Sequence, residues 1–90
     1  MGVSHLTKPI YLSQHARLKL SARGCSEAEI EEAIRTEPRA AAELGRLECR
    51  KSYPFHDVWN GTHYEMKEVR PIFVGEHHRI VVVTVYTYFR

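Results

Sequence analysis

Three ionisable side chains recur every four residues early in the chain: His15, Lys19 and Arg23. A spacing of four places side chains above one another on a single face of a helix. Histidine can transfer protons near neutral pH, while lysine and arginine can hold a phosphate and stabilise the charge that grows on it. We call these three residues the cationic row. Residues of these types could cleave RNA without a metal, by proton transfer from the ribose 2′-hydroxyl and to the leaving oxygen.

The neighbours of the cationic row on the predicted helix are apolar. At about 100° per residue, Leu18 and Ala22 fall on one side of the row, and Ala16 and Leu20 fall on the other. We therefore expect the row inside the apolar arc, where unpaired charge is costly. Three arrangements would resolve this conflict. The row could pair with carboxylates, it could extend to solvent along an edge of the helix–sheet contact, or it could line a cleft that admits an anion. The sequence leaves all three open.

The last predicted strand, residues 79–89, brings hydroxyl groups and aromatic rings together. Strict alternation puts five of its residues on one face: Ile80, Val82, Thr84, Tyr86 and Tyr88. If that face meets the cationic row, Thr84 and Tyr86 would complete a polar cleft, and Tyr88 would offer a ring for base stacking. Cross-strand packing is the alternative role for these tyrosines. Arg79 is a further candidate for contact with an RNA backbone.

The other histidines do not form a recognisable metal site. His56 and His63 flank the dipeptide Asn60-Gly61 and would lie on the same side of a two-residue hairpin, but no third ligand is evident. The adjacent pair His77-His78 would face opposite sides of a strand. The sequence therefore predicts neither a metal nor another cofactor.

The two cysteines and the chain start indicate the cellular compartment. Cys25 and Cys49 fit no metal or redox spacing, which favours reduced thiols. The start MGVSHLTKPI has no long apolar run, so it does not read as a signal peptide, and no stretch reaches membrane-spanning length. We expect a cytoplasmic protein that does not bind membranes.

Charge is unevenly distributed, although the net charge of the 90 residues is only +2. Residues 1–24 hold four basic residues and no acidic ones, whereas residues 25–45 hold two basic and six acidic ones. Two helices of opposite charge could attract each other. Alternatively, one surface could bind a polyanion and another a basic partner.

Capping signals define the helices that would carry these residues. Ser13 is a predicted N-cap and Gly24 a predicted C-terminal stop for a helix between them. Ser26 begins a capping box for a second helix, which Pro38 ends. The sequence thus predicts an N-terminal helical hairpin.

After Pro38 the pattern changes to alternation typical of strands, with turns expected at Gly45 and Asn60-Gly61. Pro71 suits an edge strand or a bulge, and residues 9–13 read as a short strand. We predict a single α+β domain over residues 1–90, with the helical hairpin on one face of a mostly antiparallel sheet of about four strands.

The string QHARLKLSARGCSEAEIEEAI, the hairpin after it and the closing RIVVVTVYTY resemble a family of small bacterial domains of unknown function. These domains carry a His-Ala…Arg-Gly-x-Ser signature and are grouped with RelE/BrnT-like toxins, which share the fold of barnase, the EndoU nucleases and the tRNA-cutting colicins. The similarity covers most of residues 10–88.

The resemblance assigns roles to five residues of this chain. The family histidine falls on His15 and its second arginine on Arg23, while Lys19 replaces an arginine and so lacks its bidentate fork. The family's hydroxyl or aromatic positions in the last strand fall on Thr84 and Tyr86. The resemblance implies a metal-independent ribonuclease of toxin type, with RNA as substrate and an antitoxin as partner.

A second function remains open at this stage. The same fold could serve as a non-catalytic module that binds another protein through its acidic second helix or a sheet edge. Neither the RNA sequence preference nor the oligomeric state can be predicted from the residues.

Overall fold

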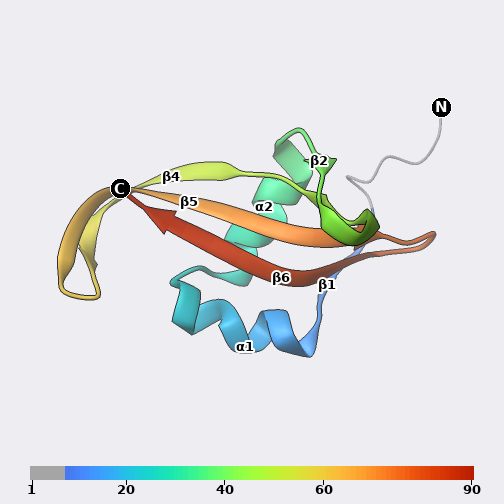
Figure 1. Cartoon of the computed structure of the whole chain (residues 1–90), viewed down its shortest axis with the longest axis horizontal. Helices are drawn as coiled ribbons and strands as arrows, with labels where there is room; N and C mark the ends of the chain where they lie inside the picture. Colours follow the sequence, from blue (N-terminus) through green and yellow to red (C-terminus); the bar gives the residue numbers. More distant parts are fainter. Residues whose placement is uncertain (1–7) are drawn as a thin grey trace.

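The computed structural model describes residues 8–90, which form two helices and a six-stranded mixed sheet (Figure 1). The helices are α1 (Gln14–Arg23) and α2 (Glu27–Thr36). The strands are β1 (Ile10–Leu12), β2 (Ala40–Ala41), β3 (Leu47–Glu48), β4 (Lys51–Trp59), β5 (Thr62–Gly75) and β6 (Ile80–Phe89). The prediction of an α+β fold is therefore confirmed.

Local capping determines where both helices begin and end, as predicted. The Ser13 side chain accepts a hydrogen bond from the backbone N–H of Ala16, and Gly24 ends α1 in the left-handed conformation. Ser26 and Glu29 form a complete capping box at the start of α2. The helical hairpin is thus specified by residues close in sequence.

The predicted number of about four strands is too low, and the sheet is mixed, although four of its five strand pairings in residues 8–90 are antiparallel. The strand order is β1-β6-β5-β3-β2, with β4 also pairing to β5 beyond the end of β3. β1 runs parallel to β6, and Ile10 pairs with Ile80. α1 follows β1 directly and packs against β6.

The core lies between the helices and one face of the sheet. Ile30, Ala33 and Ile34 of α2 are fully buried against a cluster that includes Val69 and Phe73 of β5. This apolar burial supplies the main driving force that holds α2 on the sheet. Neither α1 nor α2 covers the opposite face of the sheet, which we call the open face (Figure 1).

A bulge in β6 changes which side chains share a face. Thr84 pairs with Ile72, but Val82 pairs with Phe73, so Val83 has no partner on β5. Ile80 and Val82 consequently lie in the core with their side chains on the helix side. The prediction that Ile80 and Val82 share a face with Thr84, Tyr86 and Tyr88 is therefore wrong.

The proline of β5 lies close to this irregularity. Pro71 sits in an internal strand, between β6 and the β3–β4 side of the sheet, so an edge position is wrong. The register shift begins between Ile72 and Phe73, immediately after it. Of the two settings predicted for Pro71, an edge strand or a bulge, the structure therefore supports the bulge.

The long hairpin of β4 and β5 turns at Asn60 and Gly61, as predicted, and Trp59 pairs with Thr62. The Trp59 ring stacks on Phe89 of β6 with ring centroids 5.1 Å apart. Trp59 also closes over Gly24, where an added Cβ would lie 2.9 Å from the indole. This packing fixes the end of α1 against the sheet.

Neither helix among residues 8–90 has the length and apolar character needed to cross a membrane. The start of the chain, on which the expectation about a signal peptide depends, lies outside the described residues.

Candidate functional site

The cationic row is not flanked by core on both sides, contrary to the sequence prediction. Ala16 is the only fully buried residue of α1, and Leu18 is 72% exposed. The reason is that α1 packs against β6 and β1, at the border of the sheet, and touches them through a narrow face around Ala16 and Leu20. The row runs along this border, from exposed His15 to half-buried Arg23.

No carboxylate of residues 8–90 forms an ion pair with the cationic row. By contrast, Arg17 on the same helix lies 3.1 Å from a carboxylate oxygen of Glu27. Of the three arrangements left open by the sequence, internal ion pairing is therefore not observed. The positive charge of Lys19 and Arg23 remains available to an external anion.

The end of the row reaches an aromatic ring on β6. The guanidinium carbon of Arg23 lies 5.4 Å from the ring centroid of Tyr86, a distance typical of a cation–π contact. The Nε of Arg23 is buried without a hydrogen-bond partner. An unsatisfied buried donor of this kind is costly. Because this atom is closed to solvent, an anionic oxygen beside Tyr86 would have to bind the terminal nitrogens of half-buried Arg23.

A second guanidinium approaches the same ring from β5. Arg70 pairs with Tyr86 across the sheet, and its guanidinium carbon lies 5.5 Å from the ring centroid. Tyr86 is 37% exposed and belongs to the open face. Arg23 and Arg70 thus bring two delocalised cations to a single tyrosine.

The charge of Arg70 is largely engaged within the protein. Its Nη2 and Nε donate to the two carboxylate oxygens of Glu48 at 2.6 and 3.2 Å, and its Nη1 donates to the hydroxyl of Tyr88 at 3.1 Å. These hydrogen bonds raise the pKa of Arg70 and lower that of Glu48. Arg70 therefore positions the tyrosines and is less free than Arg23 to bind a ligand.

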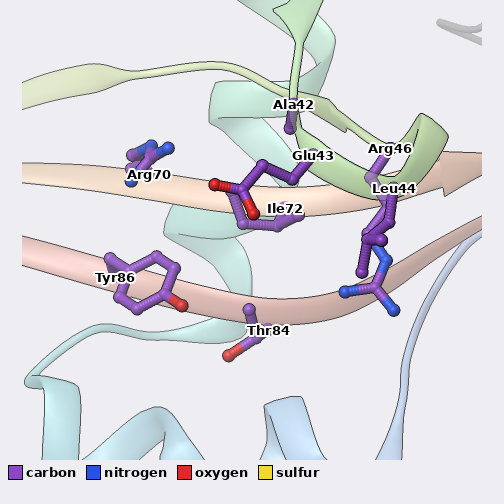
Figure 2. A pocket seen from close by; sticks show the side chains of 8 residues that line it. All are labelled: Ala42, Glu43, Leu44, Arg46, Arg70, Ile72, Thr84 and Tyr86. Carbon is purple, nitrogen blue, oxygen red and sulfur yellow. The ribbon is translucent and has the colours of Figure 1, made fainter.

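A pocket with a volume of about 250 Å³ opens beside Tyr86 on the open face (Figure 2). Its lining consists of Ala42, Glu43, Leu44, Arg46, Arg70, Ile72, Thr84 and Tyr86. Tyr86 and Arg46 stand at opposite ends of the pocket, with Glu43 and Thr84 between them (Figure 2). The predicted residues Thr84 and Tyr86 thus share one cavity.

Sequence reasoning missed three polar residues of this pocket. Glu43 and Arg46 lie on the short loop between β2 and β3, and that loop carries no motif that indicates a site. Arg70 did carry a signal, because it is a charged residue within the otherwise apolar run VRPIFV. Such a residue in a buried strand marks a polar face or a paired charge.

Two of the predicted residues lie apart from the pocket. His15 is exposed, and its side chain has no hydrogen bond or ion pair to any other residue of the described chain. Arg79 lies before β6, where it pairs with Glu76 at 2.7 Å and approaches the ring of Tyr11. The lining of the pocket includes neither of these residues.

The histidines of the β4–β5 hairpin share a carboxylate. His56 and His63 lie 2.5 and 3.3 Å from the two oxygens of Glu65. Residues 8–90 contain no group of three or more histidine, cysteine or acidic side chains arranged to bind a metal ion.

Both cysteines are unsuited to nucleophilic chemistry. Cys25 and Cys49 are free thiols. Burial raises the pKa of Cys25, and it raises that of Cys49 to about 11. Neither thiol is therefore ionised appreciably at neutral pH.

Comparison with protein-family models, with curated proteins and with solved structures gives no match. The relationship to RelE/BrnT-like toxins therefore stays a prediction from the residues. The function must be argued from the geometry of the α1–β6 border and of the pocket next to it.

Proposed function

We propose that this chain is a RelE/BrnT-like ribonuclease that cleaves single-stranded RNA without a metal at the border between α1 and β6. The observation that carries the proposal is the position of Arg23, unpaired with any described carboxylate and directed at the exposed ring of Tyr86. A cation without a carboxylate partner beside a partly exposed tyrosine suits an RNA phosphate next to a base.

In the proposed reaction the ribose 2′-oxygen attacks the adjacent phosphorus, and the bond from phosphorus to the 5′-oxygen breaks. The products are a 2′,3′-cyclic phosphate and a free 5′-hydroxyl. Arg23 and Lys19 stabilise the charge on the phosphorane, His15 takes the proton of the 2′-hydroxyl, and water gives a proton to the leaving 5′-oxygen. Thr84 and Tyr86 orient the substrate through their hydroxyl groups, and Tyr88 and Arg79 extend the contact along the RNA.

The test is cleavage of a single-stranded RNA oligonucleotide in the presence of EDTA, with detection of the cyclic phosphate. We expect cleavage by the wild type, and no cleavage of the matching DNA, which lacks the 2′-hydroxyl. His15→Ala and Arg23→Met should each lower the rate by about a hundredfold or more. Arg17→Met is the matched control, because Arg17 lies on the same helix but is paired with Glu27.

Intact RNA after incubation with the wild type would overturn the nuclease proposal. The melting temperature of each variant shows whether it is folded, and exposed His15 should tolerate alanine without a measurable change. A rate lost equally in Arg17→Met would indicate general electrostatic attraction in place of a defined site.

The exposed leucines favour the second candidate, a non-catalytic protein-binding module. Leu18 on α1 is 72% exposed, and Leu44 in the loop beside the pocket is 84% exposed. An antitoxin or another partner would cover them. Co-expression with the product of the neighbouring gene tests this function: a stable complex that Leu18→Asp disrupts, together with no RNA cleavage, would favour the module.

A further inference from the structure

The loop between β2 and β3 exposes an apolar side chain in a strained backbone conformation. Leu44 is 84% exposed. Its φ of 59° and ψ of 34° lie in the left-handed region, which a leucine rarely adopts because its Cβ crowds the neighbouring carbonyl oxygen. A glycine at this position would be free of that strain. The fold of the single chain therefore does not account for a leucine here.

Two residues of opposite charge flank Leu44 and Gly45 in the sequence. The side chains of Glu43 and Arg46 have no hydrogen bond or ion pair to any residue from 8 to 90. The Glu43 carboxylate lies toward the Tyr86 end of the pocket, and the Arg46 guanidinium lies at the other end (Figure 2). The two groups therefore do not neutralise each other within one chain.

Backbone hydrogen bonds hold the loop in a closed turn. The N–H of Arg46 donates to the carbonyl of Glu43 at 3.1 Å, and the N–H of Ala42 donates to the carbonyl of Arg46 at 2.8 Å. Both charged side chains and Leu44 therefore leave from one short, fixed segment. Such preorganisation lowers the entropic cost of forming a contact through this loop.

The order of residues in the loop is self-complementary about a two-fold axis. If two copies lie antiparallel with the axis between residues 44 and 45, residue 43 of each copy faces residue 46 of the other. Glu43 and Arg46 then form two reciprocal ion pairs. Leu44 of each copy faces Gly45 of the other, where a side chain would meet nothing within 4 Å, so the leucine has open space to enter.

We propose that this loop is the contact of a symmetric dimer, in which Glu43 pairs with Arg46 of a second copy of the chain and Leu44 packs on its Gly45. A second copy necessarily presents the matching order of charges, which is why it is the partner that fits this loop. A contact through one loop of each copy buries less than the roughly 1,200 Å² of a standard interface, so the dimer is weak. The inference does not depend on the proposed nuclease.

Sedimentation velocity over protein concentrations from about 1 μM to about 1 mM measures the association constant. Glu43→Arg and Arg46→Glu each place like charges opposite one another, and each should lower this constant by at least about tenfold. The double variant exchanges the two charges and should recover the wild-type constant to within about threefold. An equimolar mixture of the two single variants should also dimerise, because each supplies the charges that the other lacks.

A glycine variant tests the apolar part of the contact without disturbing the fold. Leu44→Gly removes the side chain from a backbone that glycine adopts without strain, and this relief offsets the greater freedom of glycine in the unfolded chain. The melting temperature should therefore be nearly unchanged, while the association constant should fall by about tenfold. Leu18→Ala is the matched control, because Leu18 is 72% exposed on α1 and should not affect association.

Four results would overturn the dimer contact. A wild type that stays monomeric at every concentration would leave Leu44 to a different protein. A dimer that persists in both single charge variants would place the interface elsewhere. Failure of the double variant to recover association would exclude reciprocal pairing of Glu43 and Arg46. An equal loss in Leu18→Ala and Leu44→Gly would indicate non-specific association of apolar side chains.

Discussion

The guanidinium of Arg23 lies over the ring of Tyr86, 5.4 Å from its centroid, and so connects the cationic row of α1 with the open face of the sheet. The two residues belong to opposite sides of the helix–sheet contact. Their meeting depends on α1 lying at the border of the sheet, where a long side chain can pass around the edge of β6. An RNA strand that crosses this border would contact both.

The contribution of the row to RNA binding should be visible in its salt dependence. Each phosphate contact that is removed should reduce the slope of log affinity against log salt by about 0.7 for a single strand. Arg23→Met and Lys19→Met should each show this reduction, measured by anisotropy over a potassium chloride series. In Arg17→Met the slope should remain that of the wild type, and equal reductions in all three variants would show that no particular phosphate is held.

Gly24 should be far less tolerant of substitution than Gly45. Both have a positive φ, +69° and +72°, but an added Cβ at Gly24 would lie 2.9 Å from the Trp59 ring, whereas Gly45 has nothing within 4 Å. We expect Gly24→Ala to lower the free energy of unfolding by about 2–4 kcal/mol, and Gly45→Ala by about 1–2 kcal/mol. Denaturant titration of both variants checks this difference.

Similar losses in the two alanine variants would mean that the indole shifts without cost. The comparison is informative because the backbone penalty for a left-handed residue is common to both positions. The contacts that an added Cβ would make with Trp59 and Phe89 are what differs between them.

The features that the sequence predicts correctly are local ones. Ser13, Gly24 and the capping box from Ser26 to Glu29 each act within about one helical turn, and Asn60-Gly61 determines its own hairpin. These signals act through neighbouring residues and therefore do not depend on contacts with distant parts of the chain. The helical hairpin and the β4–β5 hairpin could therefore be predicted from the residues.

The missed features depend on contacts between distant parts of the chain. Alternation in β6 fails at Val83 because the bulge forms against β5, and the helical wheel of α1 fails because the helix lies at a border. The pocket joins the loop around Glu43 and Arg46 to Thr84, some forty residues later. Thr84 and Tyr86 were predicted near the site, but nothing local indicated what they would face.

The buried pair of Lys67 and Glu29 should behave as a coupled unit. Lys67 Nζ lies 2.8 Å from a carboxylate oxygen of Glu29 and also donates to the carbonyl of Gly24 at 3.1 Å. Lys67→Met would leave Glu29 without its partner, and we expect a loss of about 2–3 kcal/mol in unfolding free energy. Because Glu29 is partly exposed, the loss should lie at the lower end for such pairs.

A double-variant cycle isolates this pair. Glu29→Gln preserves the capping box, since glutamine can also bond the backbone at that position. Lys67→Met combined with Glu29→Gln should therefore be more stable than Lys67→Met alone, as measured by denaturant titration. Additive losses in the cycle would show that the helix packing, and not the ion pair, accounts for the effect.

The ion pair of Glu48 and Arg70 should make the stability of the protein sensitive to acid. Hydrogen bonds from Arg70 lower the pKa of Glu48 below its ordinary value of 4.5, so the unfolded chain binds this proton more readily than the folded one. The stabilisation is therefore fully present above the unfolded pKa and is lost as the pH falls through the folded pKa. Glu48→Gln removes the titrating group and leaves an isosteric side chain.

Melting temperatures of the wild type and Glu48→Gln at a series of pH values test this linkage. Near neutral pH the wild type should melt at the higher temperature, and the difference should shrink progressively once the pH falls below the unfolded pKa of Glu48. A difference that stays constant down to pH values below the folded pKa would mean that the two residues are held by packing alone. Because Arg70 also donates to Tyr88 and approaches Tyr86, loss of the pair should additionally weaken RNA binding at neutral pH.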